Sequence, residues 1–185
     1  MHALTHEVAY GALLHERRRD LHVRILEAME HLYADRLEEQ VERLAQDALR
    51  GEAWDKAAAY WRQAAMRAED RSAFQAALQY FDRGLEALGH LPESRDLLER
   101  RLENMWQRHS ALFVLGHREE LLASFDVQLP LAEALGNQER IARLTNGMGN
   151  VLWVSAEYVR ALPLSERGLA IADQIGERTL RIITR

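Results

Sequence analysis

The stretch WDKAAAYWRQA, residues 54–64, decides the fold class of this chain. In this stretch the aromatic Trp54 is followed by Ala57 three residues later, and a second aromatic, Trp61, follows four residues after that. A small residue, Ala45, lies upstream. Small residues allow two helices to cross closely, and bulky neighbours fill the space beside the crossing. The pattern therefore predicts a helical hairpin that stacks on copies of itself. Its members are Ala45, Trp54, Ala57, Trp61 and Ala64.

Two further copies of this pattern occur, and one of them shares a helix with the first. Their members are Ala65, Phe74, Ala77, Phe81 and Gly84, and Gly149, Tyr158, Ala161, Ser165 and Gly168. Two similar helix ends, closed by Gly136 and Gly176, lie forty residues apart. This spacing exceeds the 34 residues of the common tetratricopeptide repeat, so we expect longer helices. Stacked hairpins of this kind are typical of binding surfaces rather than of catalysts.

Apolar periodicity and turn residues together predict about ten helices and no strands. Ser72 is expected to cap a helix, Pro130 to break or bend one, and Pro163 to kink another. The clearest break in the chain is GHLP, residues 89–92. The expected helices span residues 3–14, 17–33, 38–50, 54–71, 72–88, 93–115, 118–135, 137–155, 157–175 and 178–185.

Composition narrows the functional class. Of 185 residues, 48% are apolar and 29% are charged, which is typical of a folded chain. No apolar run approaches the roughly 20 residues that span a bilayer. Cysteine is absent, which excludes thiolate chemistry and favours the cytoplasm. The net charge of -5 gives no general attraction to nucleic acid or to an anionic membrane.

The repeats resemble tetratricopeptide repeats. The residues that carry this resemblance are Leu44, Ala45, Ala48, Trp54, Ala57, Trp61 and Ala64, and Met148, Gly149, Leu152, Tyr158, Ala161, Ser165 and Gly168. Residues 93–135 match the repeat pattern poorly. The resemblance implies an all-α fold of antiparallel helical hairpins stacked in a right-handed superhelix, an α-solenoid.

The first residues are similar to the segment after the ATPase domain of bacterial AAA/STAND-type signalling proteins, which often carry class III adenylate or guanylate cyclase domains. The resemblance lies in HALTHEVAY (2–10), LLHERRRDLH (13–22) and YADR (33–36), and it continues into the Trp153 repeat. It implies an N-terminal helical segment, 1–36, that continues from an ATPase region, followed by repeats over 37–185 with a truncated last repeat. Because no GxxxxGK[ST] loop or cyclase motif is present, neither activity is carried over.

One polar stripe is a candidate binding site. Arg143, Asn146 and Asn150 share a helix face, and Trp153 extends it. If Gly149 lies at the hairpin crossing, we expect these side chains to face the groove of the repeats. Arginine and asparagine there would hold a carboxylate or a peptide backbone, and the tryptophan would add an apolar anchor. Groove lining without a dedicated ligand is the alternative. We expect a protein or peptide partner, with the upstream ATPase domain of the same chain as one candidate, and no cofactor or catalytic residue.

Several other features have competing interpretations. His2 and His6 have zinc-ligand spacing, so a small metal-binding protein or enzyme that uses them is an alternative, but a third ligand is missing and no metal site is expected. Residues 15–22 hold two histidines and three arginines, which we interpret as a solvated, salt-bridged helix face rather than a nucleic-acid site. The NGMG sequence at 146–149 is interpreted as glycines at a close helix crossing, not as a phosphate loop. The uncapped apolar end, residues 180–183, favours either a longer natural chain or a homo-oligomer.

Overall fold

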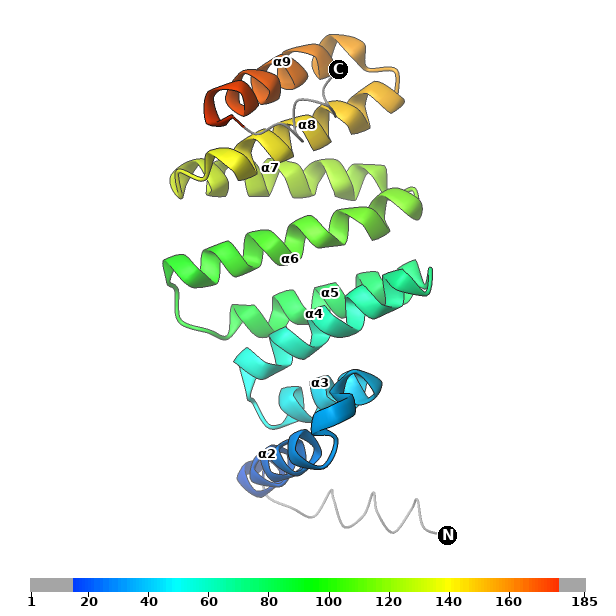
Figure 1. Ribbon diagram of the computed structural model, residues 1–185, viewed down its shortest axis with the longest axis vertical. Coiled ribbons are helices and arrows are strands. Elements are labelled where there is room, and N and C mark those ends of the chain that lie inside the picture. The colour runs from blue at the N-terminus through cyan, green and yellow to red at the C-terminus, as the bar shows by residue number, and fades with distance from the viewer. Residues whose placement is uncertain (1–14, 177–185) are drawn as a thin grey trace. The chain divides into compact units, whose positions relative to one another are not determined.

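The computed structural model describes residues 15–176, and every regular element in this range is helical (Figure 1). The all-α class is therefore confirmed for the described part of the chain. The elements are α2 (His15–Leu32), the 3-10 helix η1 (Ala34–Gln40), α3 (Val41–Arg50), α4 (Trp54–Asp70), α5 (Phe74–Gly89), α6 (Arg95–Val114), α7 (Arg118–Ala134), α8 (Gln138–Val154) and α9 (Tyr158–Ile175).

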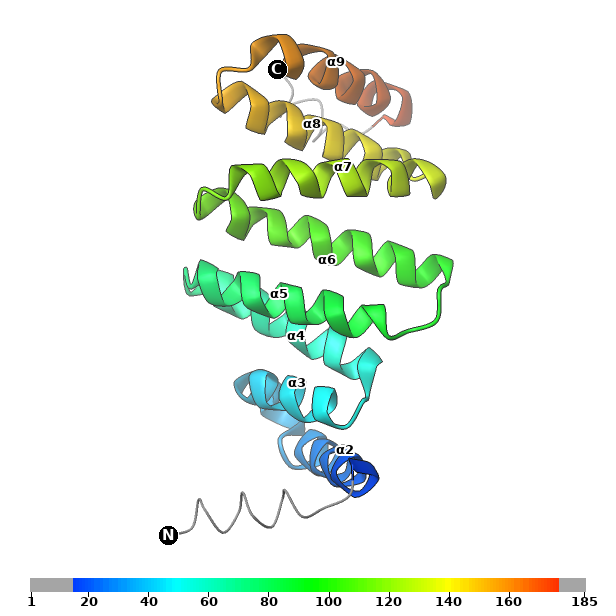
Figure 2. The ribbon, with the colours of Figure 1, turned by 180° about the vertical axis from the view of Figure 1, so that it is seen from behind.

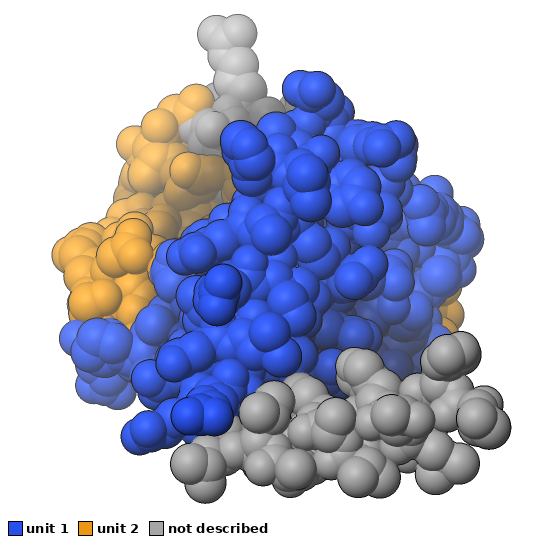
Figure 3. All heavy atoms as spheres, turned by 90° about the horizontal axis from the view of Figure 1, so that it is seen from below, with its two compact units in different colours: residues 1–93 blue, residues 94–185 orange. Residues whose placement is uncertain are grey.

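The chain divides into two compact units, residues 1–93 and 94–185 (Figure 3). The division follows the break at residues 89–92, and α6 then begins with a capped turn in which Ser94 Oγ accepts from the Leu97 amide at 3.1 Å. The predicted boundary between residues 36 and 37 lies inside unit 1. There η1 contains Arg36, whose φ of -149° is not helical, between α2 and α3.

Consecutive helices within each unit pack side by side as antiparallel hairpins, as both ribbon views show (Figure 2). Five of the connections are three-residue turns of the same type. In each, a backbone amide donates a hydrogen bond to the carbonyl oxygen five residues earlier. These bonds run from Ala53 to Ala48, Ala73 to Ala68, His117 to Leu112, Asn137 to Ala132 and Glu157 to Leu152, at 2.8–3.1 Å. Each turn also holds one residue with positive φ, which in three turns is not glycine: Glu52, Ser72 and Ala156.

Unit 1 contains the predicted hairpin core. Trp61 of α4 and Phe81 of α5 are fully buried among alanines of α3, α4 and α5. The Arg83 guanidinium lies 4.8 Å above the Trp61 ring, which covers this core with a cation–π contact. The alternation of small and aromatic residues in the sequence thus marks the helix contacts of this unit.

Unit 2 repeats with the predicted period. Its turns at Gly116 and Ala156, and at Gly136 and Gly176, are each forty residues apart and each have positive φ. Glycines at the α8–α9 crossing permit the expected close approach. A Cβ on Gly149 would lie 2.7 Å from Ser165 Oγ, and a Cβ on Gly168 would lie 2.9 Å from Thr145 Oγ1. The interpretation of the NGMG sequence as a close helix crossing is confirmed.

Three local predictions need correction or comment. Ser72 does not cap α5; it adopts φ 59° in the turn, and Ala73 precedes the helix without a side-chain cap. Helix α7 continues through Pro130, and α9 continues through Pro163, its sixth residue. Each proline removes a backbone amide that would otherwise donate to the carbonyl oxygen four residues earlier, yet neither proline ends its helix. The helices expected over 3–14 and 178–185 lie outside the described residues. The right-handed superhelix stays a prediction.

Candidate functional site

The structure does not bring the four predicted groove residues onto one surface. Arg143 is partly exposed, but its guanidinium is paired with Glu139 one turn earlier on α8, at 2.6 Å. Asn146 is buried, and its amide packs where a side chain on Gly168 would otherwise lie. Because Gly168 has no side chain, Asn146 fills the α8–α9 crossing instead of facing solvent. The predicted arginine–asparagine clamp is therefore not assembled in unit 2.

Asn150 and Trp153 are exposed, as predicted. The Trp153 ring meets the Tyr158 ring of α9 edge-on, with centroids 4.8 Å apart. Of the predicted stripe, then, Trp153 is the member that belongs to a larger exposed group.

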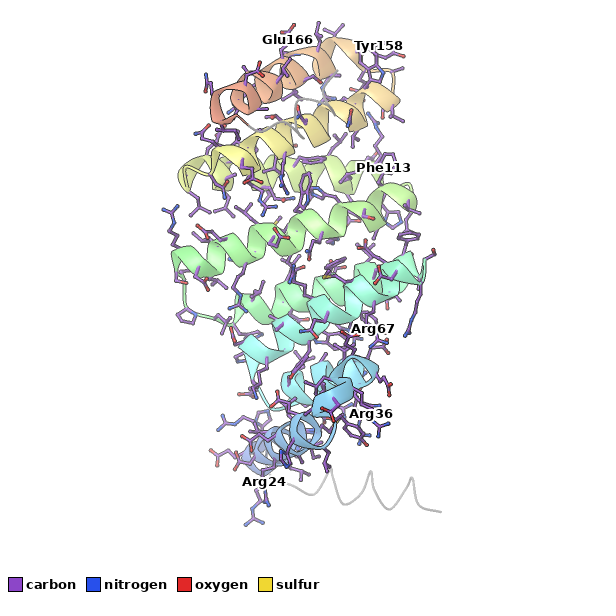
Figure 4. The ribbon with its side chains drawn as sticks, in the orientation of Figure 1. Arg24, Arg36, Arg67, Phe113, Tyr158 and Glu166 are labelled. Carbon is purple, nitrogen blue, oxygen red and sulfur yellow. The ribbon has the colours of Figure 1, made fainter. Side chains whose placement is uncertain are left out.

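That group is a set of apolar residues on unit 2, each more than half exposed, which we call the apolar surface. Its members are Phe113, Val114, Trp153, Val154, Tyr158, Val159 and Leu162. They come from the C-terminal ends of α6 and α8 and from the first turns of α9. The labelled Phe113 and Tyr158 lie at the same edge of unit 2 (Figure 4). Two pairs within this set are neighbours, Trp153 with Tyr158 and Phe113 with Val154 on one hollow, and neighbouring exposed apolar side chains indicate an interaction site more than scattered ones do.

The tight turn between α8 and α9 explains why these side chains gather. Only residues 155–157 separate the two helices, and Ala156 adopts φ 60° to close the turn. This geometry places the last residues of α8 beside the first residues of α9, so that Trp153 and Tyr158 touch. The α6–α7 turn is built in the same way, with Gly116 at the equivalent position.

An apolar hollow lies between the two turns. Its volume is about 310 Å³, and Phe113 and Val154 of the apolar surface form part of its wall. Its floor is Leu112, Leu121 and Val151, all of which are buried. The hollow is at the lower end of the roughly 300–1,000 Å³ range of ligand pockets, a size that suits side chains better than a large cofactor.

Charged residues rim this hollow. Arg118 lines it and is paired with Glu157, which also accepts a 2.6 Å bond from Arg160. The Nε atom of Arg118 is buried and has no hydrogen-bond partner among the described residues. An apolar centre with a polar rim is the usual anatomy of a protein interface.

Sequence reasoning missed most of the apolar surface, although a signal was present. Apolar pairs stand at the ends of two successive helices, at residues 113–114 and 153–154, where polar residues would suit the exposed turn. These pairs are forty residues apart and thus follow the repeat period. The repetition predicts two equivalent apolar positions on adjacent hairpins.

A buried polar cluster joins α6 and α7. Gln128 Nε2 lies 2.6 Å from His109 Nε2 and 2.9 Å from Ser124 Oγ, and all three side chains are buried. Burial, with smaller contributions from Arg108 and Arg140, lowers the pKa of His109 to about 4. The imidazole is therefore neutral at pH 7.

The repeat period explains why these polar residues lie at a helix crossing. His109 and Gln128 stand forty residues before Gly149 and Gly168, so they occupy the positions that glycines fill in the next hairpin. The Ser124 hydroxyl and the His109 imidazole are adjacent, as in a nucleophile–base pair, but such a pair needs a third group that orients the base. No described carboxylate does so, since His109 Nδ1 lacks a hydrogen-bond partner among residues 15–176. We interpret the cluster as a polar packing element. It also explains the poor repeat match of residues 93–135.

A second buried pair corrects the interpretation of residues 15–22. His15 and Arg19 lie 3.6 Å from Glu52, as expected for a salt-bridged face. His22, however, is buried and its Nδ1 lies 2.8 Å from Asp47 Oδ1 on α3. The solvated interpretation is wrong for His22 because this residue faces α3 rather than solvent.

The described residues show neither a metal-binding cluster nor a helix that could cross a membrane. Within residues 15–176, no group of three or more His, Asp or Glu side chains is placed to hold a metal ion. His2 and His6 lie outside this range. None of the described helices is both long and apolar enough to cross a bilayer.

Comparison with solved structures supports the all-helical fold, and comparison with protein families identifies no family. No protein-family model matches the sequence, and no match was found among curated proteins. The fold is similar to that in the crystal structure of BtubC (BKLC) from P. vanneervenii, with a TM-score of 0.61 and 17% sequence identity. The match covers 90% of this chain and 76% of that one. At this identity the likeness shows the fold alone.

Proposed function

We propose that this chain is a non-catalytic protein-interaction module that binds an apolar segment of a protein or peptide partner on the apolar surface. One observation carries the proposal: exposed aromatic and valine side chains flank an apolar hollow of about 310 Å³ on unit 2. Burying a side chain such as Val or Phe is worth about 1.5–3 kcal/mol. A partner that covers several of these residues gains this free energy.

The repeat arrangement supports a linear binding segment. The pairs at residues 113–114 and 153–154 present equivalent side chains on α6 and α8, on either side of the hollow. A partner segment with two apolar side chains can therefore contact both pairs. Trp153 is the expected hot spot because large aromatic residues dominate interface energies.

Selection of peptides from a random-sequence library against the full chain tests this proposal. We expect the selected peptides to share at least two apolar positions. Trp153→Ser should weaken their binding by about tenfold or more, which corresponds to at least about 1.4 kcal/mol. Leu32→Ser is the control, since Leu32 is also exposed, at 73% against 58% for Trp153, but lies on α2 of unit 1.

Two results would contradict the proposal. The first is selection of peptides whose affinity is the same for wild type and Trp153→Ser. The second is concentration-dependent self-association in sedimentation experiments that Phe113→Ser abolishes, because the occupant would then be a second copy. The predicted self-association through residues 180–183 is distinguishable, since Phe113→Ser would leave it unchanged.

We also propose that the module is the regulatory, C-terminal part of a bacterial signalling ATPase or cyclase-like protein in the cytoplasm. The support is the resemblance of residues 2–36 to the segment after such ATPase domains, together with the absence of cysteine. An immunoblot of the native source tests this. A band far above 21.3 kDa agrees with the proposal, and a band at 21.3 kDa contradicts it.

A further inference from the structure

A polar pocket in unit 1 is separate from the apolar surface. It has a volume of about 370 Å³ and lies between η1, the start of α3 and the C-terminal end of α4. Nearly all of its lining is polar, and both signs of charge are present. The charged residues are Glu38, Glu39, Glu42, Arg43, Arg67 and Arg71.

Arg67 is the most informative residue of this polar pocket. It lies in the last turn of α4, where Figure 4 shows it above Arg36 of η1. Its Nη1 atom is buried and has no hydrogen-bond partner among the described residues. A buried donor without an acceptor costs about 1–3 kcal/mol, and more when the group is charged. A ligand oxygen placed in the pocket would recover this loss.

Arg71 provides a second guanidinium at the same wall. It follows Arg67 by one helical turn, so both side chains lie on the same side of the helix. Both residues line the pocket. Two adjacent guanidinium groups suit the planar, two-oxygen geometry of a carboxylate.

The acidic residues determine which anion fits. Glu42 accepts a hydrogen bond from Tyr80, and burial together with this carboxylate raises the pKa of the Tyr80 hydroxyl. Glu42 is thus directed toward α5, whereas Glu38 and Glu39 are exposed at the pocket. Glu38 and Glu39, which have no salt-bridge partner among residues 15–176, repel a phosphate dianion or a nucleic acid, and they attract an ammonium group.

We propose that the polar pocket binds a small zwitterionic ligand of amino-acid or dipeptide size, with its carboxylate on Arg67 and Arg71 and its ammonium group on Glu38 and Glu39. The volume is at the lower end of the roughly 300–1,000 Å³ range of ligand pockets, which limits the ligand to this size. The site shares no residue with the apolar surface, so it does not depend on the proposed partner binding.

Titration of the full chain with free amino acids and glycylglycine, followed by amide NMR, tests the proposal. At least one zwitterion should shift the amides of Val41 and Arg43 at concentrations up to about 10 mM. Its N-acetylated form, which keeps only the carboxylate, and its amide, which keeps only the ammonium group, should each bind about tenfold more weakly. Inorganic phosphate should bind more weakly still.

Matched variants identify the residues involved. Arg67→Gln should weaken binding by about tenfold or more, whereas Arg24→Gln, on α2 away from the pocket, should bind like wild type. Arg67→Gln should also remain folded by circular dichroism, because it removes a buried charged donor without an acceptor. If Arg67→Gln unfolds, the exposed Arg71→Gln replaces it and should show the same loss of affinity.

Three results would overturn the proposal. One is the absence of any shift at the pocket amides with every zwitterion tested. Another is binding of phosphate or an N-acetylated ligand at least as tight as that of the zwitterion, which would indicate a simple anion site. The third is unchanged affinity in the folded arginine variant.

Discussion

Replacing Gly168 with alanine should destabilise unit 2, because this glycine lies where α8 and α9 cross. The new Cβ would lie 2.8 Å from Asn146 Cγ and 2.9 Å from Thr145 Oγ1. Both neighbours are buried, and Thr145 Oγ1 is held by a 2.8 Å bond to the Ile141 carbonyl, so neither can move freely. Overpacking of this kind costs about 1–3 kcal/mol, and occasionally more. Alanine gains about 1 kcal/mol over glycine within a helix. With the steric cost at the upper end, the net loss should be about 2 kcal/mol.

Gly89→Ala is the matched control, because the same substitution meets no atom within 4 Å at the end of α5. It should leave stability unchanged or raise it by up to about 1 kcal/mol. Urea unfolding followed by circular dichroism measures both variants. The two should therefore differ by about 2–3 kcal/mol.

A double variant tests the cause. Asn146→Ala removes the atoms nearest the new Cβ, so Gly168→Ala should cost less in that background than in wild type. The reasoning would be refuted if Gly168→Ala were as stable as Gly89→Ala. Equal costs of Gly168→Ala in both backgrounds would show that Asn146 is not the obstacle.

Three further predictions concern polar groups that are buried or half-buried. Because folding lowers the pKa of His109 from 6.5 to about 4, the unfolded chain binds a proton that the folded chain excludes. Stability should be full above about pH 6.5 and fall by about 3 kcal/mol as the pH drops to about 4, and His109→Gln should flatten this part of a pH series of urea titrations. Asp47→Ala leaves the buried His22 without its carboxylate and should cost about 1–3 kcal/mol by urea unfolding; no loss would contradict the reasoning. Tyr60→Phe removes the hydroxyl that donates to Glu30 at 2.6 Å and should lower stability by about 1–2 kcal/mol in thermal unfolding, whereas an unchanged Tm would show that this bond contributes nothing.

The fold could largely be predicted from the sequence because the patterns that specify it involve residues close together in the chain. The spacing of Trp61, Phe81 and their small neighbours reports directly which helix faces are buried. The forty-residue period likewise appears as Gly136 and Gly176, whose left-handed conformation closes two equivalent turns. Ser72 also adopts the left-handed conformation in a turn, but because it is not glycine, its residue type predicted a helix cap instead.

The candidate site was harder to predict, since it depends on which side of a helix its neighbour covers. Arg143, Asn146 and Asn150 share a face by spacing, yet the crossing at Gly168 buries Asn146 while Asn150 stays exposed. Trp153 is exposed, as predicted, but it lies beside Tyr158 of α9 and not beside an arginine–asparagine clamp. Residues on one helix face can therefore differ in burial, because the neighbouring helix decides which of them are covered.

The sequence by itself determined the all-helical class, the hairpin period and the buried positions of Trp61 and Phe81, because short-range spacing specifies helix faces and turns. Only the tertiary structure decided that Asn146 packs at a crossing, that His22 pairs with Asp47, and that Arg67 lines a polar pocket. These outcomes join residues from different helices. They depend on how closely two helices approach, which no spacing within one helix specifies.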